Sequence, residues 1–455
     1  GRPDAPERFC KTSRHDSVSA GNGAKDRRSS AQIRENASPL RNFLSYAVIF
    51  HWTSGVVHCT LSPSGQTQNL PRRILMPGFT LPSMPRQTTR MPAIDALKAF
   101  ACLAIVMHHL AFYGPMSDAA RPLMPTLVQW LDEYARMAVQ IFLVVSGFLF
   151  AAKFAPSGLT AKLSPLPVLL QRYTRLVVPY SAALLLAVAC SAVAGVWMEH
   201  NSISAAPDLG QLLAHVLLLH DLLNQEALSA GVWYVAIDFQ LFALAILLLW
   251  LPSRLAERRP ELALVAPLLV VLLTLASLFG FNRDAFWDET ALYFFGSFGL
   301  GILAWWAGSQ PRAERWLALL TAVAVAALVV DFRARIAVAT GVMLFLGLAR
   351  QHGFLNTLPV PAAVAHLSRI SYSVFLVHFP LCLLVNMLVS VAFPTNPVIN
   401  AMGMVLAVVM SVIGGHQFHY RVESYPFRTR TRLLFPAGVV AGGWLTALAA
   451  ANLAG

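Results

Sequence analysis

One apolar segment of the chain, residues 90–113, carries ionisable side chains whose types and spacing could serve chemistry. On an α-helix at about 100° per residue, the eleven-residue step from Lys98 to His109 closes to within roughly 20°, so both side chains share one face. Asp95 lies on that face as well. At about 1.5 Å of rise per residue, the cation and the imidazole are roughly 16 Å apart along the axis. They are too far apart for contact, but one extended ligand could reach both.

Ionisable groups inside such an apolar segment favour a functional role. A charge at bilayer depth costs several kcal/mol unless it is paired or hydrated, so we expect these side chains to face the protein interior. The alternative is that Lys98 extends to the cytoplasmic surface and His109 lies at the opposite interface.

The composition of the whole chain is that of a membrane protein. Of its 455 residues, 56% are hydrophobic and only 12% are charged, which is far from the composition of soluble globular proteins. We therefore predict an all-α fold, a polytopic membrane helical bundle of about 10–11 transmembrane helices. The net charge of +12 does not indicate a nucleic-acid partner, because residues 1–90 hold thirteen Lys and Arg against five Asp and Glu. The five cysteines are scattered and predict neither a disulfide framework nor a metal site.

The chain divides into three parts by composition. Residues 1–91 form a basic leader that we expect to be disordered and cytoplasmic. We interpret part of this leader as non-native, because the chain starts with Gly1 and several methionines precede the first strong helix. Residues 92–430 form the predicted membrane-embedded domain, and residues 431–455 add a C-terminal transmembrane helix.

Eleven apolar segments from residue 92 onward are long enough, or nearly so, to cross a membrane as helices. They centre on residues 94–113, 135–153, 176–198, 231–251, 262–281, 291–308, 316–331, 335–349, 370–392, 397–420 and 434–454. The seventh and eighth are short. Residues 199–230 contain an apolar stretch too short to span, which suggests an interfacial or re-entrant helix. Lys and Arg are concentrated in alternate loops, so the positive-inside rule predicts a cytoplasmic N-terminus and an outside C-terminus.

Two motifs in the second and third segments have both a structural and a functional interpretation. Ser146 and Gly147 put two small residues in mid-membrane, which favours close helix packing, although Ser146 is also a candidate pocket residue. Arg172 and Arg175 lie one helical turn apart at the cytoplasmic end of the third segment. They could grip a phosphate or diphosphate, or they could simply mark a cytoplasmic helix end. The sequence supports both interpretations about equally.

Polar side chains also occur in the fourth and ninth segments. Asp238 and Gln240 lie a turn or two inside the fourth, where an unpaired carboxylate is costly, so we expect them to line a cavity. Tyr372 lies at the cytoplasmic end of the ninth segment, and His378 follows about two turns further in. Both are candidate pocket residues, although a single histidine on such a helix is more often a packing residue than a catalyst.

Taken in order, these stretches resemble the acyltransferase type 3 family of integral membrane O-acyltransferases. The resemblance covers about residues 92–430 and depends on the ordered set rather than on any single motif. The motifs are Ile94-Asp95-Ala96-Leu97-Lys98 followed by His109, then FLVVSGFLF, the arginine pair before LVVPY, WYVAIDFQLF, RISYSVFLVHFP and the Glu423–Phe427 tail.

Some positions depart from the family pattern. Lys98 stands where arginine is commoner, which puts bidentate recognition at that point in doubt. Asp238 stands where glutamate is usual, and the ESYPF tail is one residue longer than the frequent ERPF. The spacing selects His109 without excluding its neighbour His108.

The resemblance implies transfer of a short acyl group, most often acetyl, from acyl-CoA to a hydroxyl of a carbohydrate or related envelope molecule. In that interpretation His109 is the general base, Lys98 and Asp95 position CoA or support the network, and Arg172 and Arg175 meet the CoA phosphates. The implied partners are acyl-CoA as donor substrate, a glycan or glycolipid acceptor and the bilayer of the bacterial inner membrane. No tightly bound cofactor is expected.

Other functional classes stay open at this point. Buried His, Asp and Arg side chains also suit a proton-coupled transporter or exporter, although the sequence shows no matching halves. A non-catalytic protein that only binds a lipid or glycan is a third class. Within the enzyme class, a covalent acyl intermediate on histidine or on Ser146 is an alternative to direct transfer.

Overall fold

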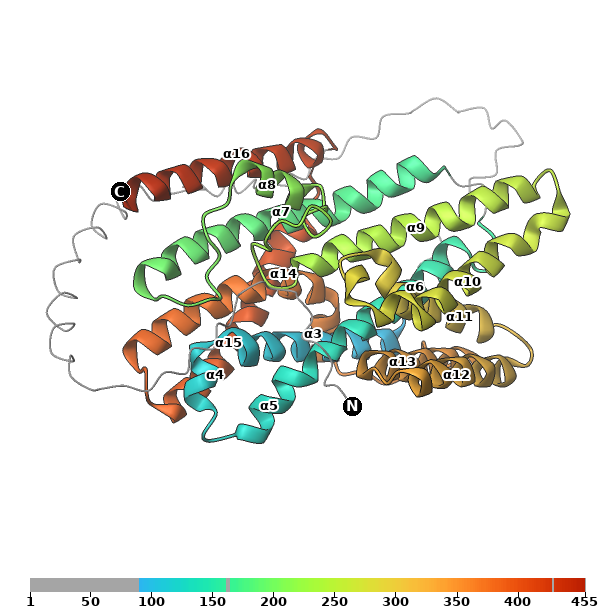
Figure 1. The fold of residues 1–455 in the computed structure, drawn as a ribbon, viewed down its shortest axis with the longest axis horizontal. Coiled ribbons are helices and arrows are strands. Elements are labelled where there is room, and N and C mark those ends of the chain that lie inside the picture. The colour runs from blue at the N-terminus through green and yellow to red at the C-terminus, as the bar shows by residue number, and fades with distance from the viewer. Residues whose placement is uncertain (1–89, 161–163, 428, 455) are drawn as a thin grey trace, which may run out of the picture. The chain divides into compact units, whose positions relative to one another are not determined.

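The structure, a computed structural model, describes residues 90–160, 164–427 and 429–454, and within these ranges the chain is helical and contains no strand (Figure 1). The long helices are α3 (Pro92–Tyr113), α6 (Val139–Phe154), α7 (Pro165–Trp197), α9 (Val232–Ala256), α10 (Val265–Phe279), α11 (Ala291–Ala307), α12 (Ala313–Val330), α13 (Ala334–Gln351), α14 (Ala362–Ala392), α15 (Pro397–Phe418) and α16 (Thr429–Ala454). The shorter ones are α4 (Pro115–Ala120), α5 (Pro125–Glu133) and α8 (Leu209–Val216).

The helices confirm the predicted all-α membrane bundle. Within the described ranges, nine helical segments are long and apolar enough to cross a membrane, and α11 and part of α16 are shorter apolar helices. Together they account for the eleven apolar segments found in the sequence. The short seventh and eighth segments are the separate helices α12 and α13, each of 18 residues. The basic leader lies outside the described residues apart from Arg90 and Met91, so its predicted disorder stays a prediction.

Helix α14 packs along α3, the helix that carries Lys98 and His109. It also packs against α7 and α15, and α3 in turn contacts α6. Ser368 of α14 contacts Asp95 near the start of α3, and His378 contacts His109 near its end, so α14 runs along most of α3. The ionisable face of α3 is therefore enclosed by neighbouring helices rather than turned toward lipid.

Helices α6 and α11 approach each other through glycine. A Cβ added to Gly147 would overlap the backbone carbonyl of Phe298, and one added to Gly301 would overlap the carbonyl of Val144. Backbone atoms cannot give way as a flexible side chain can, so these positions need the smallest residue. The close-packing interpretation of the Ser146-Gly147 motif is therefore confirmed for Gly147.

The segment between α7 and α9 returns along α7 instead of staying at its end. The Tyr173 hydroxyl, in the first third of α7, donates a hydrogen bond to the carbonyl of Val216 at 2.9 Å. Helix α8 also packs against α16, which lies along α7 (Figure 1). Asp208 caps α8 by accepting a hydrogen bond from the Gln211 N–H at 2.7 Å. Val216 of this segment thus lies beside α7, and the interfacial or re-entrant position of residues 199–230 in a membrane stays a prediction.

Candidate functional site

The structure joins two histidines that lie 269 residues apart in the chain. Nδ1 of His109 on α3 is 2.7 Å from Nε2 of His378 on α14, and the two rings are nearly parallel. His109 is 9% exposed and His378 is fully buried. The histidine that the sequence presented as an isolated residue is thus the direct partner of the candidate base.

A backbone carbonyl fixes the protonation pattern of this pair. Nδ1 of His378 is 2.7 Å from the carbonyl oxygen of Phe375, and a carbonyl only accepts, so this nitrogen carries hydrogen. With both imidazoles neutral, the state that needs no buried charge, Nε2 of His378 then accepts from Nδ1–H of His109. The same tautomer leaves Nε2 of His109 with an open lone pair. An open imidazole nitrogen whose ring is held by hydrogen bonds is the arrangement that a general base requires.

The structure also separates His109 from its neighbour His108. Nδ1 of His108 is 3.0 Å from the carbonyl oxygen of Leu131 on α5, and its ring lies against Phe112. His108 therefore ties α3 to α5, whereas His109 faces α14. This geometry favours His109 over His108 as the base.

Charged side chains gather near the N-terminus of α3, well away from the histidine pair. Oδ1 of Asp95 accepts a hydrogen bond from Ser368 at 2.7 Å, and Oδ2 pairs with Arg90 at 2.8 Å. Lys98 lies in the electrostatic field of Asp95 and of Glu423, which attract it. We call Asp95, Lys98 and Glu423 the cytoplasmic-end cluster, in line with the predicted topology.

Glu423 was not singled out as a site residue by the sequence, where it appeared only in the Glu423–Phe427 tail. It lies in a π-helical turn, His419–Glu423, that follows α15. Its Oε2 accepts a hydrogen bond from Ser373 of α14 at 2.6 Å and is 2.9 Å from Nδ1 of His419. The π turn is the signal that could have drawn attention to it, since such turns are frequent at functional sites, but it is visible only in the structure.

Besides the histidine pair and the cytoplasmic-end cluster, a third cluster of polar side chains connects three helices. Arg172 of α7 forms an ion pair with Oδ2 of Asp238 on α9, and the Ser146 hydroxyl of α6 donates to Oδ1 of the same carboxylate at 2.9 Å. Arg172 also lies over the Phe242 ring at 5.3 Å. The costly carboxylate of the fourth segment is therefore paired, and its partner is one of the two arginines considered for phosphate binding.

The remaining candidates have separate environments. Arg175 is exposed and lies within electrostatic reach of Lys98 and Tyr372. The Tyr372 hydroxyl donates to the carbonyl of Leu176 at 3.0 Å, which ties α14 to α7. Nε2 of Gln240 is buried and makes no hydrogen bond to any described residue.

The model of a family described as an acyltransferase domain matches residues 91–416, which is well over half of the chain. No match was found among curated proteins or among solved structures. The matched region includes the histidine pair, the Arg172–Asp238 ion pair, Asp95 and Lys98, but not Glu423.

The family match and the helical bundle agree on one conclusion. The matched region carries the ordered motifs of the sequence, and the described chain contains nine segments able to cross a membrane. The chain belongs to the acyltransferase type 3 family and is a polytopic membrane acyltransferase.

Proposed function

We propose that this protein is an O-acyltransferase of the bacterial inner membrane that moves a short acyl group, most simply acetyl, from acyl-CoA to a hydroxyl of an envelope carbohydrate. The observation that carries the proposal is the hydrogen-bonded chain from His109 through His378 to the carbonyl of Phe375. It supplies an oriented imidazole with one open nitrogen inside the domain that the family model matches.

In the proposed reaction His109 first accepts a proton from the acceptor and later returns it to the leaving group. Nε2 of His109 takes the proton of the acceptor hydroxyl while the hydroxyl oxygen bonds to the carbonyl carbon of the thioester. The tetrahedral intermediate then expels the CoA sulfur, and the imidazolium returns its proton to that sulfur. The products are the acyl ester and free CoA, so atoms and charge balance without another reactant.

His378 assists by holding the ring and by stabilising its transient charge. When His109 becomes an imidazolium, its Nδ1–H donates more strongly to Nε2 of His378. The proton on Nδ1 of His378 is in turn held by the carbonyl of Phe375. His378 is thus a positioning residue, comparable in logic to the group that orients the histidine of a hydrolase triad.

The donor is proposed to approach from the cytoplasmic-end cluster. Acyl-CoA is strongly anionic, and exposed Arg175 and half-buried Lys98 are two cations at that end which could meet its phosphates. From Lys98 to His109 the axial distance is about 16 Å, which a pantetheine arm can bridge. Arg172 is engaged by Asp238, so its proposed contribution is to hold α7, α9 and α6 in register beside this route.

One experiment separates acyl transfer from the rival function of proton-coupled transport. Membranes containing the protein are given acetyl-CoA labelled in the acetyl group together with an isolated envelope glycan fraction. We expect label in the glycan and an equal amount of free CoA, with a rate that an uncoupler of the proton gradient does not change. Solute movement that collapses with the uncoupler, without release of CoA, would contradict the proposal.

The donor route has its own test. Arg175→Ala should raise KM for acetyl-CoA about ten-fold, the effect of one lost charge-assisted contact, and leave kcat at saturating donor nearly unchanged. Arg258→Ala is the matched control, because Arg258 is also an exposed arginine, in the loop after α9. Equal KM values for the two variants would reassign Arg175 to membrane topology alone.

A further inference from the structure

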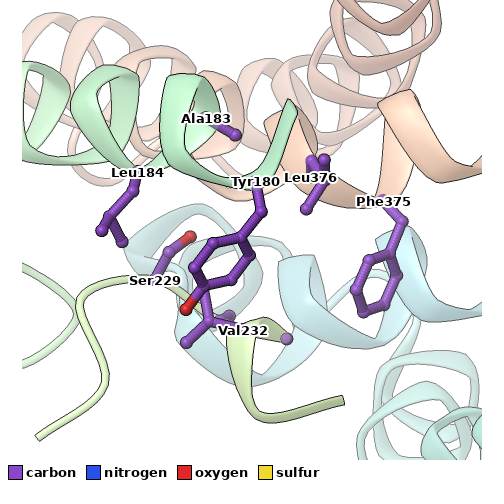
Figure 2. A pocket seen from close by; sticks show the side chains of 9 residues that line it. Tyr180, Ala183, Leu184, Ser229, Val232, Phe375 and Leu376 are labelled. Atoms are coloured by element: carbon purple, nitrogen blue, oxygen red, sulfur yellow. The ribbon is translucent and has the colours of Figure 1, made fainter. Parts of the chain in front are cut away.

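A small cavity lies where the segment between α7 and α9 meets the bundle. Its walls come from α7, from residues just before α9 and from α14, and Figure 2 shows Tyr180, Ser229 and Phe375 around it. The cavity volume is about 10 Å³, about the space that one water molecule or one hydroxyl group occupies. Elements that are far apart in the sequence thus enclose a site of defined size.

Two hydroxyl groups at this cavity are buried without a partner. Tyr180 is 1% exposed and Ser229 is 5% exposed. Neither hydroxyl makes a hydrogen bond to any of the residues that the structure describes. Burying a hydroxyl without a hydrogen bond costs on the order of 1–3 kcal/mol, so such groups normally have a partner. A hydroxyl both donates and accepts, and the natural complement of two of them is a water molecule or another hydroxyl.

The charged groups that act on this region are acidic. Asp221 is close enough to Tyr180 to act on it electrostatically, and Asp288 and Glu289 act on Asp221 in turn. His220 is fully buried, and its Nε2 is 3.5 Å from Oδ2 of Asp221. Residues 199–230 contain no Lys or Arg. The carboxylate of Asp221 does not line the cavity itself, so the walls offer hydroxyls rather than a charge.

The cavity is connected to the histidine pair through one residue. The Phe375 side chain lines the cavity, and its backbone carbonyl is the group that accepts from Nδ1 of His378. The Phe375 and His378 rings are 6.0 Å apart between centroids. Gly231 makes this possible, because its φ of 85° is unsuited to other residues and an added Cβ would lie 2.9 Å from the Phe375 ring. A ligand seated here would lie one helical turn along α14 from the proposed chemistry.

We propose that Tyr180 and Ser229 form a subsite that receives one hydroxyl of an uncharged, hydroxyl-rich acceptor such as a neutral sugar. This inference rests on the proposed function and adds to it the class of acceptor and the residues that recognise it. Asp288 and Glu289, together with the ionised fraction of Asp221, disfavour acidic sugars and phosphorylated lipids by repulsion. The segment between α7 and α9 is then the part of the chain that selects the acceptor, while α3 and α14 carry the reaction.

The first experiment measures binding without turnover. The full-length protein in lipid nanodiscs is titrated with glucose, galactose and N-acetylglucosamine, and with glucuronate as the anionic counterpart, while Tm is recorded. We expect at least one neutral sugar to raise Tm and glucuronate to leave it unchanged. Tyr180→Phe and Ser229→Ala should each raise the half-saturating concentration roughly ten-fold, the change expected for one hydrogen bond.

The control variant is Tyr425→Phe, which removes the hydroxyl of an exposed tyrosine beyond α15. Both cavity variants remove hydroxyls that have no partner among the described residues, so they should fold at least as well as the wild type. No Tm shift with any neutral sugar, equal binding of glucuronate, or unchanged binding by both cavity variants would overturn the proposal and leave only a site for buried water.

The second experiment keeps this inference distinct from the proposed function. Transfer of labelled acetyl to the envelope glycan fraction should show a raised KM for the glycan in Tyr180→Phe, with KM for acetyl-CoA unchanged. A raised KM for acetyl-CoA instead would assign the cavity to the donor route and overturn the subsite. Sugar binding without any acetyl transfer by the wild type would sustain the subsite and contradict the proposed function.

Discussion

Two buried histidine pairs in this protein use the same chemistry in different ways. His109 and His378 meet edge to edge, nitrogen to nitrogen at 2.7 Å, whereas His215 and His220 stack face to face with ring centroids 4.2 Å apart. In the second pair, Nδ1 of His215 donates to the carbonyl of Gln211 at 2.8 Å, and its Nε2 accepts from the Leu228 N–H at 3.2 Å. Both ring nitrogens of His215 are therefore occupied.

The difference shows what makes a buried histidine useful for catalysis. His215 has no open nitrogen, and burial lowers its pKa to about 4, so it stays neutral and holds α8 to the segment before α9. His109 uses one nitrogen for orientation and keeps the other open. Burial is common to both pairs, and the number of occupied nitrogens separates a structural histidine from a candidate base.

The largest change in activity short of removing the base is expected from breaking the edge-to-edge pair. His378→Ala removes the acceptor for Nδ1–H of His109 and should lower kcat about 10- to 100-fold, the range found when a group that orients a histidine ligand is lost. His378→Gln keeps an acceptor oxygen near that place and should recover part of the rate. Steady-state kinetics with both variants test this, and equal rates for them would show that His378 only fills space.

Breaking the stacked pair should change stability instead of chemistry. His215→Ala leaves the Gln211 carbonyl and the Leu228 N–H without their partner, at an expected loss of about 1–3 kcal/mol in the free energy of unfolding. The kcat of the folded fraction at saturating acceptor should stay within about two-fold of the wild type. Thermal unfolding in nanodiscs and kcat per folded molecule are the two measurements. A large fall in kcat at unchanged stability would erase the proposed contrast between the pairs.

The smallest effect on activity is expected from Asp221, beside the second pair, whose ionisation should change stability with pH and leave the chemistry alone. Burial, with help from Glu289 and Asp288, raises the pKa of Asp221 from 3.8 to about 7. A carboxyl whose pKa is higher in the folded state contributes stability below pH 3.8 that is lost as the pH rises through about 7.

The measurement for Asp221 is the free energy of unfolding between pH 4.5 and pH 7.5. One such group changes it by at most about 1.4 kcal/mol per pH unit. Asp221→Asn should therefore lose less stability than the wild type over that interval. Parallel curves for the two proteins would show that Asp221 ionises normally in the folded state.

The helices and the position of the candidate base could be predicted from the sequence, because both depend on local patterns. Hydropathy identifies each helix without knowledge of its neighbours, and Lys98 and His109 share a face by the period of one helix. Family resemblance then selected His109 within the ordered motifs. The family model and the helical bundle confirm the fold and the family, while the site residues stay proposals.

Partners across the bundle could not be predicted, because pairing depends on how helices meet. His378 is 269 residues from His109, and nothing near it in the sequence indicates that its Nε2 reaches Nδ1 of His109. The ion pair of Arg172 with Asp238 is equally invisible, so the sequence offered only a phosphate ligand or a cytoplasmic helix-end residue as interpretations of Arg172. Ser229 gives no signal at all, since a serine before a helix is ordinary until the fold places it beside Tyr180.

In the proposed mechanism His109 alone supplies the base, and the most direct test compares transfer rates for His109→Gln and His108→Gln. The two variants change adjacent buried histidines of the same helix by the same substitution. We predict that His109→Gln lowers kcat about 10²- to 10⁴-fold with KM for acetyl-CoA nearly unchanged, whereas His108→Gln keeps kcat within a few-fold. Near-wild-type transfer by His109→Gln, or an equal loss in both variants, would contradict the account.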